Sequence, residues 1–117
     1  MRTVAVVEDD PSMRKGLARL LSANGFSVET FTSAESFFQD AAKCEAECLV
    51  VDIHLPGISG IDLKRRLTSS GCDLPVIFMT AMDTAITRRD AFDAGCVAYL
   101  TKPFLGKLLI DAINTVA

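Results

Sequence analysis

A short apolar run near the middle of the chain, residues 49–54 (LVVDIH), contains a single acidic residue, Asp52. An uninterrupted run of strand length that leads into the turn-forming pair Pro56-Gly57 is typical of a parallel strand buried on both faces. Open α/β sheets hold their ligands at the carboxyl ends of such strands, where Asp52 would lie. Asp52 is therefore a candidate functional carboxylate; the alternative is a purely structural role at the start of the Leu-Pro-Gly turn.

Four other apolar stretches have the same strand-like length, and segments with helical periodicity separate them. The five expected strands cover residues 3–7, 26–31, 49–54, 74–79 and 97–101. Expected helices follow caps at Asp10, Thr32, Ser59 and Asp83, and a last helix carries an apolar stripe from Leu105 to Val116. This alternation predicts one domain over residues 1–117, a three-layer α/β fold around a parallel five-stranded sheet.

The composition argues against several classes of function. Half of the residues are hydrophobic, 23% are charged, and the formal net charge is -3. Because phosphate contacts need concentrated Lys and Arg, the lack of a basic cluster argues against direct nucleic-acid binding. No apolar run is long enough to cross a membrane and the first residues show no signal-peptide pattern, which predicts a soluble, cytoplasmic domain with no membrane partner.

Four cysteines, at positions 44, 48, 72 and 96, raise the question of disulfides or a metal site. Cys44 and Cys48 have no second pair nearby at zinc-finger spacing, and the single histidine, His54, is not placed with them. A chain without a secretory signal is expected in a reducing compartment, where disulfides are rare. We therefore predict four free thiols that serve as small, mostly buried hydrophobic residues.

Polar residues follow four of the five expected strands. They are the acidic run Glu8-Asp9-Asp10, then Asp52, Thr80 and Lys102, and neighbouring parallel strands would bring them to one edge of the sheet. Carboxylates from Asp9, Asp10 and Asp52 would repel one another unless a cation lies among them, and an open all-oxygen cleft suits Mg²⁺. With the Lys102 ammonium opposite, the cluster predicts phosphoryl transfer with Asp52 as the nucleophile.

These motifs resemble those of the response-regulator receiver domain of bacterial two-component signalling, in the CheY-like superfamily. The shared elements are Asp9-Asp10 after the first strand, Asp52 followed by Leu55-Pro56-Gly57, Thr80-Ala81 after the fourth, and Tyr99-x-x-Lys102-Pro103-Phe104 around the fifth. The resemblance spans nearly the whole chain and implies a flavodoxin-like fold with strand order 2-1-3-4-5. It also implies that Asp9, Asp10, Asp52 and the backbone carbonyl of His54 bind Mg²⁺.

For function, the resemblance implies a phosphorylation-activated switch rather than an enzyme that acts on a separate substrate. Asp52 would accept a phosphoryl group from a partner sensor histidine kinase, in a transfer that the domain itself catalyses and slowly reverses by hydrolysis. Lys102 and the Ala81 backbone N–H would contact the phosphoryl group. His54 and Met82 depart from the commonest family pattern. The resemblance implies that side chains at these two positions lie over the phosphoryl group and influence how fast water removes it, so it does not fix the lifetime of the phosphorylated state.

The switch itself is expected at Thr80 and Tyr99. Thr80 would turn towards the phosphoryl oxygen and Tyr99 would move inward. The movement would remake the face formed by the helix at 84–94, the fifth strand and the last helix, where a second copy of the domain or a partner would bind. The helix at 84–94 is expected to be the loosest, because its apolar stripe is thin: Ala85 and Phe92, with Ile86 or Ala91.

Three alternatives share parts of this pattern. A haloacid-dehalogenase-type, Mg²⁺-dependent phosphohydrolase also uses an aspartyl nucleophile, but that resemblance requires a second Asp where this chain has His54. A flavodoxin would need a phosphate loop that donates hydrogen bonds, and Glu8-Asp9-Asp10 would repel a phosphate. A degenerate receiver used only as a binding module is disfavoured by the complete set of site residues. By overall resemblance, we expect a fragment of a transcriptional regulator with a C-terminal DNA-binding domain.

Overall fold

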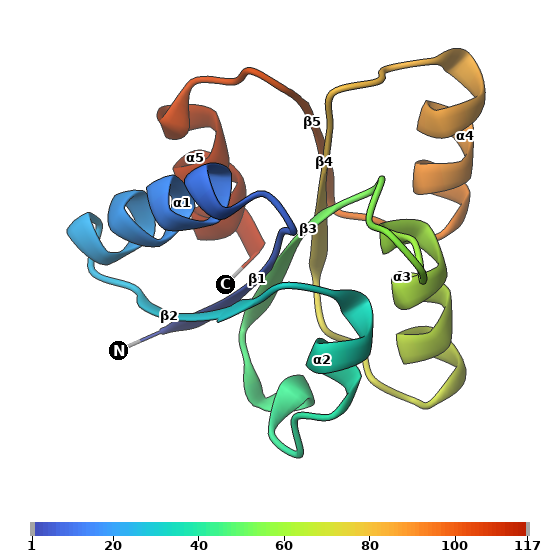
Figure 1. Ribbon diagram of the computed structural model, residues 1–117, viewed down its shortest axis with the longest axis horizontal. Helices are drawn as coiled ribbons and strands as arrows, with labels where there is room; N and C mark the ends of the chain where they lie inside the picture. The colour runs from blue at the N-terminus through green and yellow to red at the C-terminus, as the bar shows by residue number, and fades with distance from the viewer. Residues whose placement is uncertain (1, 117) are drawn as a thin grey trace.

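The computed structural model describes residues 2–116, and Met1 and Ala117 lie outside the described part. The strands are β1 (Thr3–Val7), β2 (Ser27–Phe31), β3 (Cys48–Asp52), β4 (Val76–Thr80) and β5 (Ala98–Thr101). They pair in parallel in the order β2-β1-β3-β4-β5 (Figure 1), which confirms the predicted sheet. The connecting elements are α1 (Pro11–Ala23), α2 (Ala34–Phe38), the 3-10 turn η1 (Lys43–Glu45), α3 (Gly60–Ser69), α4 (Ala85–Asp93) and α5 (Gly106–Val116).

Helices cover both faces of the sheet (Figure 1). α1 and α5 lie on one face, and α2, α3 and α4 lie on the other. Because successive side chains of a strand point to opposite faces, β3 sends Leu49 and Val51 into one core and Cys48 and Val50 into the other. Every residue of β3 is buried, as expected for a strand covered on both sides. Asp52 is therefore carried at the end of a fully enclosed strand.

The caps of α1 and α3 agree with the sequence prediction. The Asp10 carboxylate accepts a hydrogen bond from the Met13 backbone N–H, and Pro11 occupies the first turn of α1. The Ser59 hydroxyl accepts from the Asp62 backbone N–H at the start of α3. Each side chain satisfies one backbone donor that the first helical turn leaves without a partner, which fixes where the helix begins.

The predicted capping box of α2, Thr32 with Glu35, is wrong by one residue. Ser33 caps this helix and exchanges hydrogen bonds with Ser36 in a capping box. The Glu35 carboxylate instead lies 3.5 Å from the Ile58 backbone N–H, in the loop that follows β3. Because Glu35 has this partner in another part of the chain, Ser36 provides the reciprocal hydrogen bond.

The helix α4 begins one residue later than predicted and buries little of its surface. Its cap is Thr84 rather than Asp83, because the Asp83 carboxylate is engaged by two other side chains. Ala91 is the residue of α4 that becomes fully buried. Phe92 and Ile86, expected on its inner stripe, are 52% and 64% exposed. The thin apolar stripe predicted for this helix is confirmed, and its looseness relative to the other helices stays a prediction.

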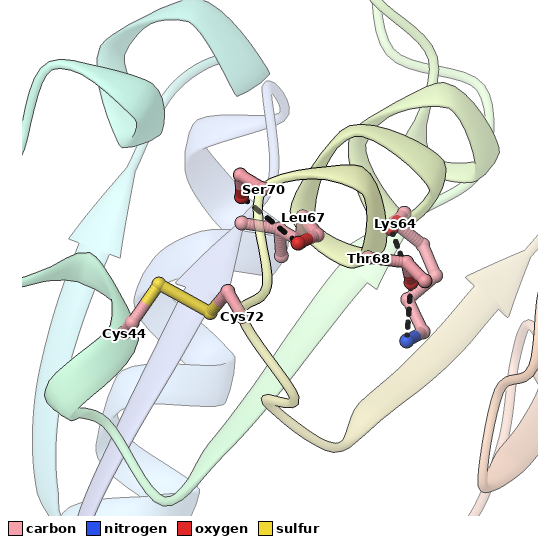
Figure 2. The surroundings of a disulfide bond; sticks show 6 residues. All are labelled: Cys44, Lys64, Leu67, Thr68, Ser70 and Cys72. Atoms are coloured by element: carbon pink, nitrogen blue, oxygen red, sulfur yellow. Dashed lines mark hydrogen bonds between the residues drawn. A yellow bond between two sulfur atoms is a disulfide. The ribbon is translucent and has the colours of Figure 1, made fainter.

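The prediction of four free thiols is wrong, because Cys44 and Cys72 form a disulfide (Figure 2). Their sulfur atoms meet because the fold places η1 beside the loop that follows α3, with the two Cα atoms 6.0 Å apart. The cysteines are separated by 28 positions, so their contact depends on how α2 and α3 pack and leaves no local signal in the sequence. Cys48 and Cys96 remain free, buried and half-buried respectively.

Gly60, the first residue of α3, allows the close approach of that helix to the end of β3. A Cβ at this position would lie 2.9 Å from the Ile53 Cα and closer still to the Asp52 carbonyl oxygen. We expect Gly60→Ala to lower the free energy of unfolding, measured by urea denaturation, by about 1–3 kcal/mol or more. Gly16→Ala, in α1 with no atom within 4 Å of the added Cβ, should instead stabilise the fold by up to about 1 kcal/mol. Equal effects of the two changes would contradict this account of the packing.

Candidate functional site

The polar residues that follow β1, β3, β4 and β5 meet at the carboxyl edge of the sheet. The pairing of Val7 with Val51 puts the next residues of the two strands, Glu8 and Asp52, beside each other. On the other side of β3, Asp52 pairs with Met79, so Thr80 lies one step further along β4. Thr80 pairs with the last residue of β5, which directly precedes Lys102. The predicted convergence of these four chain segments is confirmed.

The Asp52 carboxylate is held from two sides. Its Oδ1 accepts a hydrogen bond from the backbone N–H of His54 at 2.9 Å, and its Oδ2 accepts one from the Lys102 Nζ at 3.0 Å. The residue is only 8% exposed. The His54 side chain is exposed, and its backbone donor was not among the predicted contacts because a sequence does not show the course of the loop after β3. The arrangement fixes the carboxylate and leaves a small part of it exposed to solvent.

Lys102 also binds Glu8, so one ammonium bridges two carboxylates. The Nζ of Lys102 lies 2.6 Å from the Glu8 Oε1, and the Glu8 side chain is almost completely buried. Burial raises the pKa of Glu8, although the hydrogen bond from Lys102 opposes this effect. Burial would lower the pKa of Lys102, but its hydrogen bonds to Glu8 and Asp52 outweigh burial and the net shift is upward. The ammonium therefore stays charged and offsets part of the negative charge of its two partners. The Lys102-Pro103 peptide bond that follows is cis.

Three carboxylates cluster at this edge, and the acidic pair differs from the predicted one. Oxygen atoms of Glu8, Asp9 and Asp52 lie within 4.8 Å of one another. The Asp10 carboxylate does not belong to this group, because it caps α1. The acidic residues that lie beside Asp52 are thus Glu8 and Asp9, rather than the expected Asp9 and Asp10. The missing information was the register of β1 on β3, since three acidic residues in succession cannot show which of them faces Asp52.

Arg14 fastens the loop that carries this acidic pair. Its Nη1 donates to the backbone carbonyl of Glu8 at 2.9 Å and lies 3.5 Å from that of Asp9. The Glu8 carboxylate also accepts from the Asp10 backbone N–H at 3.2 Å. The loop between β1 and α1 is thus tied by hydrogen bonds to the helix that it enters, which limits how far the two carboxylates can move apart.

Thr80 is completely buried at the end of β4. Its hydroxyl oxygen accepts a hydrogen bond from the Met82 backbone N–H at 2.9 Å. Ala81, between these residues, is exposed, and so is Met82. The loop that begins here runs directly into Asp83 and α4, so any turn of the Thr80 side chain changes a contact of that loop.

Tyr99, on β5, is held in an outward position by residues of α4 and the loop before it. Its hydroxyl donates to the Asp83 Oδ1 at 2.9 Å, and the Arg88 guanidinium lies 4.7 Å from the centre of its ring. The other Asp83 oxygen accepts from Arg88 at 2.9 Å. Phe92 stacks on the same ring at 6.0 Å between centroids. The exposed Phe92 and the charged pair together enclose the ring of Tyr99 at the surface.

Comparison with known proteins identifies the family. The family profile described as "Response regulator receiver domain" matches residues 4–114. This chain belongs to that family, as the fold and the cluster at the carboxyl edge of its sheet indicate. Receiver domains of this family are signalling domains of two-component systems, so the resemblance seen in the sequence is confirmed.

Individual relatives are similar over most of the chain. Nodulation protein W of Bradyrhizobium diazoefficiens is 40% identical over 111 residues, which are 94% of this chain and 48% of that protein. The transcriptional regulatory protein TdiR of Thauera aromatica is 36% identical over 112 residues, 96% of this chain and 49% of TdiR. The solved structure of the response regulator StyR superposes with a TM-score of 0.88 at 44% identity, covering 98% of this chain and 58% of StyR.

The structure of FixJ-N, with a TM-score of 0.88 and 34% identity, matches almost end to end, over 99% of this chain and 93% of that one. By contrast, the chain spans about half the length of the curated relatives it matches. Within residues 2–116, no helix combines the length and the apolar character that crossing a membrane requires.

The environment of Tyr99 predicts a measurable titration. Burial and the hydrogen bond to Asp83 raise its pKa from 10.0 to about 12. This shift favours the neutral phenol in the folded state, so its contribution to stability is present below pH 10 and is lost as the pH rises through about 12. Tyr99 is the single tyrosine of a chain without tryptophan, so phenolate absorbance reports it alone.

We expect Asp83→Asn to lower the pKa of Tyr99 by roughly one unit, because the change removes the negative charge beside the hydroxyl. Asp90→Asn is the matched control, since Asp90 lies on the adjacent helix α4 and contacts Arg89 rather than Tyr99. A Tyr99 titration curve that is the same in Asp83→Asn and in the wild type would show that Asp83 does not hold the ring.

Proposed function

We propose that Asp52 is the phosphoacceptor of a phosphorylation-activated switch, phosphorylated by a partner histidine kinase in the presence of Mg²⁺. The observation that carries this proposal is the Asp52 carboxylate itself: nearly buried, fixed by His54 and Lys102, and adjacent to two further carboxylates. A carboxylate placed only for structure would not need a second and third carboxylate within 4.8 Å. Their mutual repulsion is a cost that a cation-dependent reaction explains.

The donor set at this edge fits a hard divalent cation. Three carboxylates face a single ammonium, so an excess of negative charge remains, and all the donors are oxygen atoms. We assign Asp9, Asp52 and the His54 backbone carbonyl as ligands of Mg²⁺, with Glu8 as the second acidic residue of the pair. When bound, Mg²⁺ would neutralise charge on the oxygens of the transferred phosphoryl group.

The residues of the chain supply the rest of the transfer. An Asp52 oxygen attacks the phosphorus of a phosphohistidine, so that an O–P bond forms while the N–P bond to the imidazole breaks. Lys102 already lies 3.0 Å from the Asp52 Oδ2, and its ammonium remains beside the phosphoryl oxygens after the transfer. The Ala81 backbone N–H is the further donor that we assign to those oxygens. Slow hydrolysis of the acyl phosphate at the same site would reset the switch.

Thr80 and Tyr99 would carry the signal away from the site. When the Thr80 hydroxyl turns to donate to a phosphoryl oxygen, it gives up the hydrogen bond from Met82 and shifts the loop before α4. Asp83 lies on that loop, so the hydrogen bond that holds Tyr99 outward would weaken at the same time. Tyr99 then moves inward and changes the face formed by α4, β5 and α5, through which the domain would dimerise or control an effector.

The remaining partners follow from the relatives. TdiR is named a transcriptional regulatory protein, and this chain covers 49% of it. We therefore infer that the domain works beside a C-terminal DNA-binding effector domain in the cytoplasm, with a sensor histidine kinase as phosphodonor. The domain itself has a net charge of -3, and its runs of basic residues, such as those at 64–66 and 88–89, are short, so we do not assign DNA binding to it.

The central test is phosphorylation of the purified protein with Mg²⁺ and acetyl phosphate, followed by intact mass and peptide mapping. We expect one base-labile phosphoryl group on Asp52, and none in Asp52→Asn. Asp62→Asn, an exposed acidic residue of α3, serves as the control and should be phosphorylated like the wild type. Steady release of phosphate within seconds would favour the phosphohydrolase instead, and phosphorylation of Asp52→Asn would refute the assignment.

The corrected acidic pair gives a second prediction. Asp9→Asn should weaken Mg²⁺ binding by roughly tenfold or more, because it removes a charged ligand. Asp10→Asn should leave the affinity within about twofold, because asparagine also caps a helix and the Asp10 carboxylate is outside the cluster. Magnesium-dependent shifts in melting temperature measure both. If Asp10→Asn loses the metal as Asp9→Asn does, the pair expected from the sequence, Asp9 and Asp10, is the correct one.

A further inference from the structure

The Cys44–Cys72 disulfide lies at the amino-terminal edge of the sheet, away from the carboxylate cluster. Cys44 is in η1, which leads into β3, and Cys72 is in the loop that leads into β4 (Figure 2). Asp52 and Thr80 are at the opposite ends of these strands. Since a five-residue strand spans roughly 13–16 Å, chemistry at the disulfide is separated from chemistry at Asp52 by the length of the sheet.

One side of this disulfide is open to solvent. Cys44 is exposed, whereas Cys72 is only 7% exposed and packs against the core on the α2–α3 side. Thiol–disulfide exchange needs a thiolate to approach one sulfur atom along the S–S axis, and access decides which sulfur is attacked. A small thiol can therefore reach the Cys44 sulfur, and the buried Cys72 sulfur becomes the leaving group.

The other two cysteines are poorly placed to take part in exchange. Cys48 lies in the core on the α1–α5 side of the sheet, and burial raises its pKa to about 12. Burial also raises the pKa of Cys96, which follows α4. Because the thiolate is the reactive form, both residues stay protonated at neutral pH. The exchange chemistry is thus confined to the pair Cys44 and Cys72.

The segment that the disulfide fastens, residues 39–47, has few other ties to the domain. Its 3-10 turn begins without a side-chain cap, and its hydrogen bonds from Lys43 and Glu45 run to carbonyl groups of the same segment. The Glu47 backbone N–H donates to the Thr3 carbonyl and joins the end of the segment to β1. At the start of the segment, the backbone N–H groups of Gln39 and Asp40 donate to carbonyl groups of α2. Between this anchor and Glu47, the hydrogen bonds from Ala42, Lys43 and Glu45 are internal, and a stretch held in this way opens at low free energy once a covalent tie is removed.

One residue of this segment, Lys43, lines a surface hollow between α2 and α3. The hollow has a volume of about 450 Å³ and is lined by Glu35, Phe38, Lys43, Ile58, Arg66 and Ser70. Lys43 adjoins Cys44 in the sequence, and Ser70, at the end of α3, lies two residues before Cys72. Both sides of this hollow are therefore joined by the disulfide, so its shape depends on whether that bond is intact.

We propose that Cys44–Cys72 is a reversible redox switch that controls residues 39–47 and the hollow between α2 and α3. A thiol of the glutathione class, as its thiolate, attacks the Cys44 sulfur and releases the Cys72 thiolate, which takes up a proton. A second such thiolate attacks the small-molecule sulfur of the mixed disulfide and releases Cys44. In total, two thiols become one small disulfide, and the protein gains two electrons and two protons; the reverse reaction restores the bond.

This inference rests on the proposed function in one respect, the cytoplasmic setting. In a reducing compartment, disulfides are as a rule transient, catalytic or redox-sensing rather than permanent supports. The chain would then have two separate inputs: phosphorylation at the carboxyl edge of the sheet and oxidation at the amino-terminal edge. Because the two edges are far apart, the redox state should leave phosphorylation of Asp52 unchanged.

Limited proteolysis with trypsin, combined with thiol counting, tests the switch. After oxidised glutathione, alkylation in denaturant should modify two of the four cysteines, and after reduced glutathione all four. Cleavage of the folded protein after Lys43 should be roughly tenfold or more faster in the reduced form, because the released segment opens more often. The product peptides identify the site, and acetyl phosphate labelling of both forms monitors Asp52 separately.

Three variants make the result specific. Cys44→Ser, at an exposed position, should be cleaved quickly whether oxidised or reduced, and Cys72→Ser should behave in the same way. Cys48→Ser should keep the full difference between the two redox states. Equal cleavage rates in both states would overturn the proposal, as would four thiols after oxidation or two after reduction with excess glutathione. Failure of Asp52 labelling in both states would instead count against the proposed function and leave the redox result standing.

Discussion

The ammonium of Lys102, held between the carboxylates of Glu8 and Asp52, is the interaction on which the carboxyl edge of the sheet depends. It ties the segment after β5 to the ends of β1 and β3. Two nearly buried carboxylates without this cation would repel each other and lack water to stabilise their charge. With it, the pair is neutralised in part, and the charge that remains, together with Asp9, is what a divalent cation would complement. The Lys102 ammonium therefore both stabilises this edge of the sheet and sets the charge available for its chemistry.

Much of this fold follows from the sequence, because most of its strands are largely apolar runs with a polar residue at or just after the carboxyl end. That pattern was sufficient to predict a parallel sheet and the convergence of Asp52, Thr80 and Lys102, whereas the order of the strands was implied by the family resemblance. It was insufficient for choosing among three consecutive acidic residues, since the choice depends on the register of β1 on β3. Patterns along a chain show which strands and helices form, whereas register and side-chain contacts arise only when these elements pack together.

The disulfide and the helix caps are two further features that local sequence patterns could not predict. Cys44 meets Cys72 only because α2 and α3 pack side by side, and no spacing rule links positions 28 residues apart. The caps of α2 and α4 moved by one residue because Glu35 and Asp83 had partners elsewhere. In each case a residue with the right local chemistry was used by a distant part of the chain, which local propensity cannot reveal.

The small buried surface of α4 has a consequence for energetics. A helix that buries little more than Ala91 loses little hydrophobic stabilisation when it moves, so the two positions proposed for the α4–β5–α5 face would differ by a small free energy. A difference of a few kcal/mol leaves the less stable position measurably populated without any phosphoryl group. Thermodynamic linkage then works in both directions: a partner that prefers the active face stabilises the phosphorylated domain by the same factor that phosphorylation strengthens the partner's binding. A DNA-bound or dimeric regulator would therefore retain its phosphoryl group more readily than an isolated one at equilibrium.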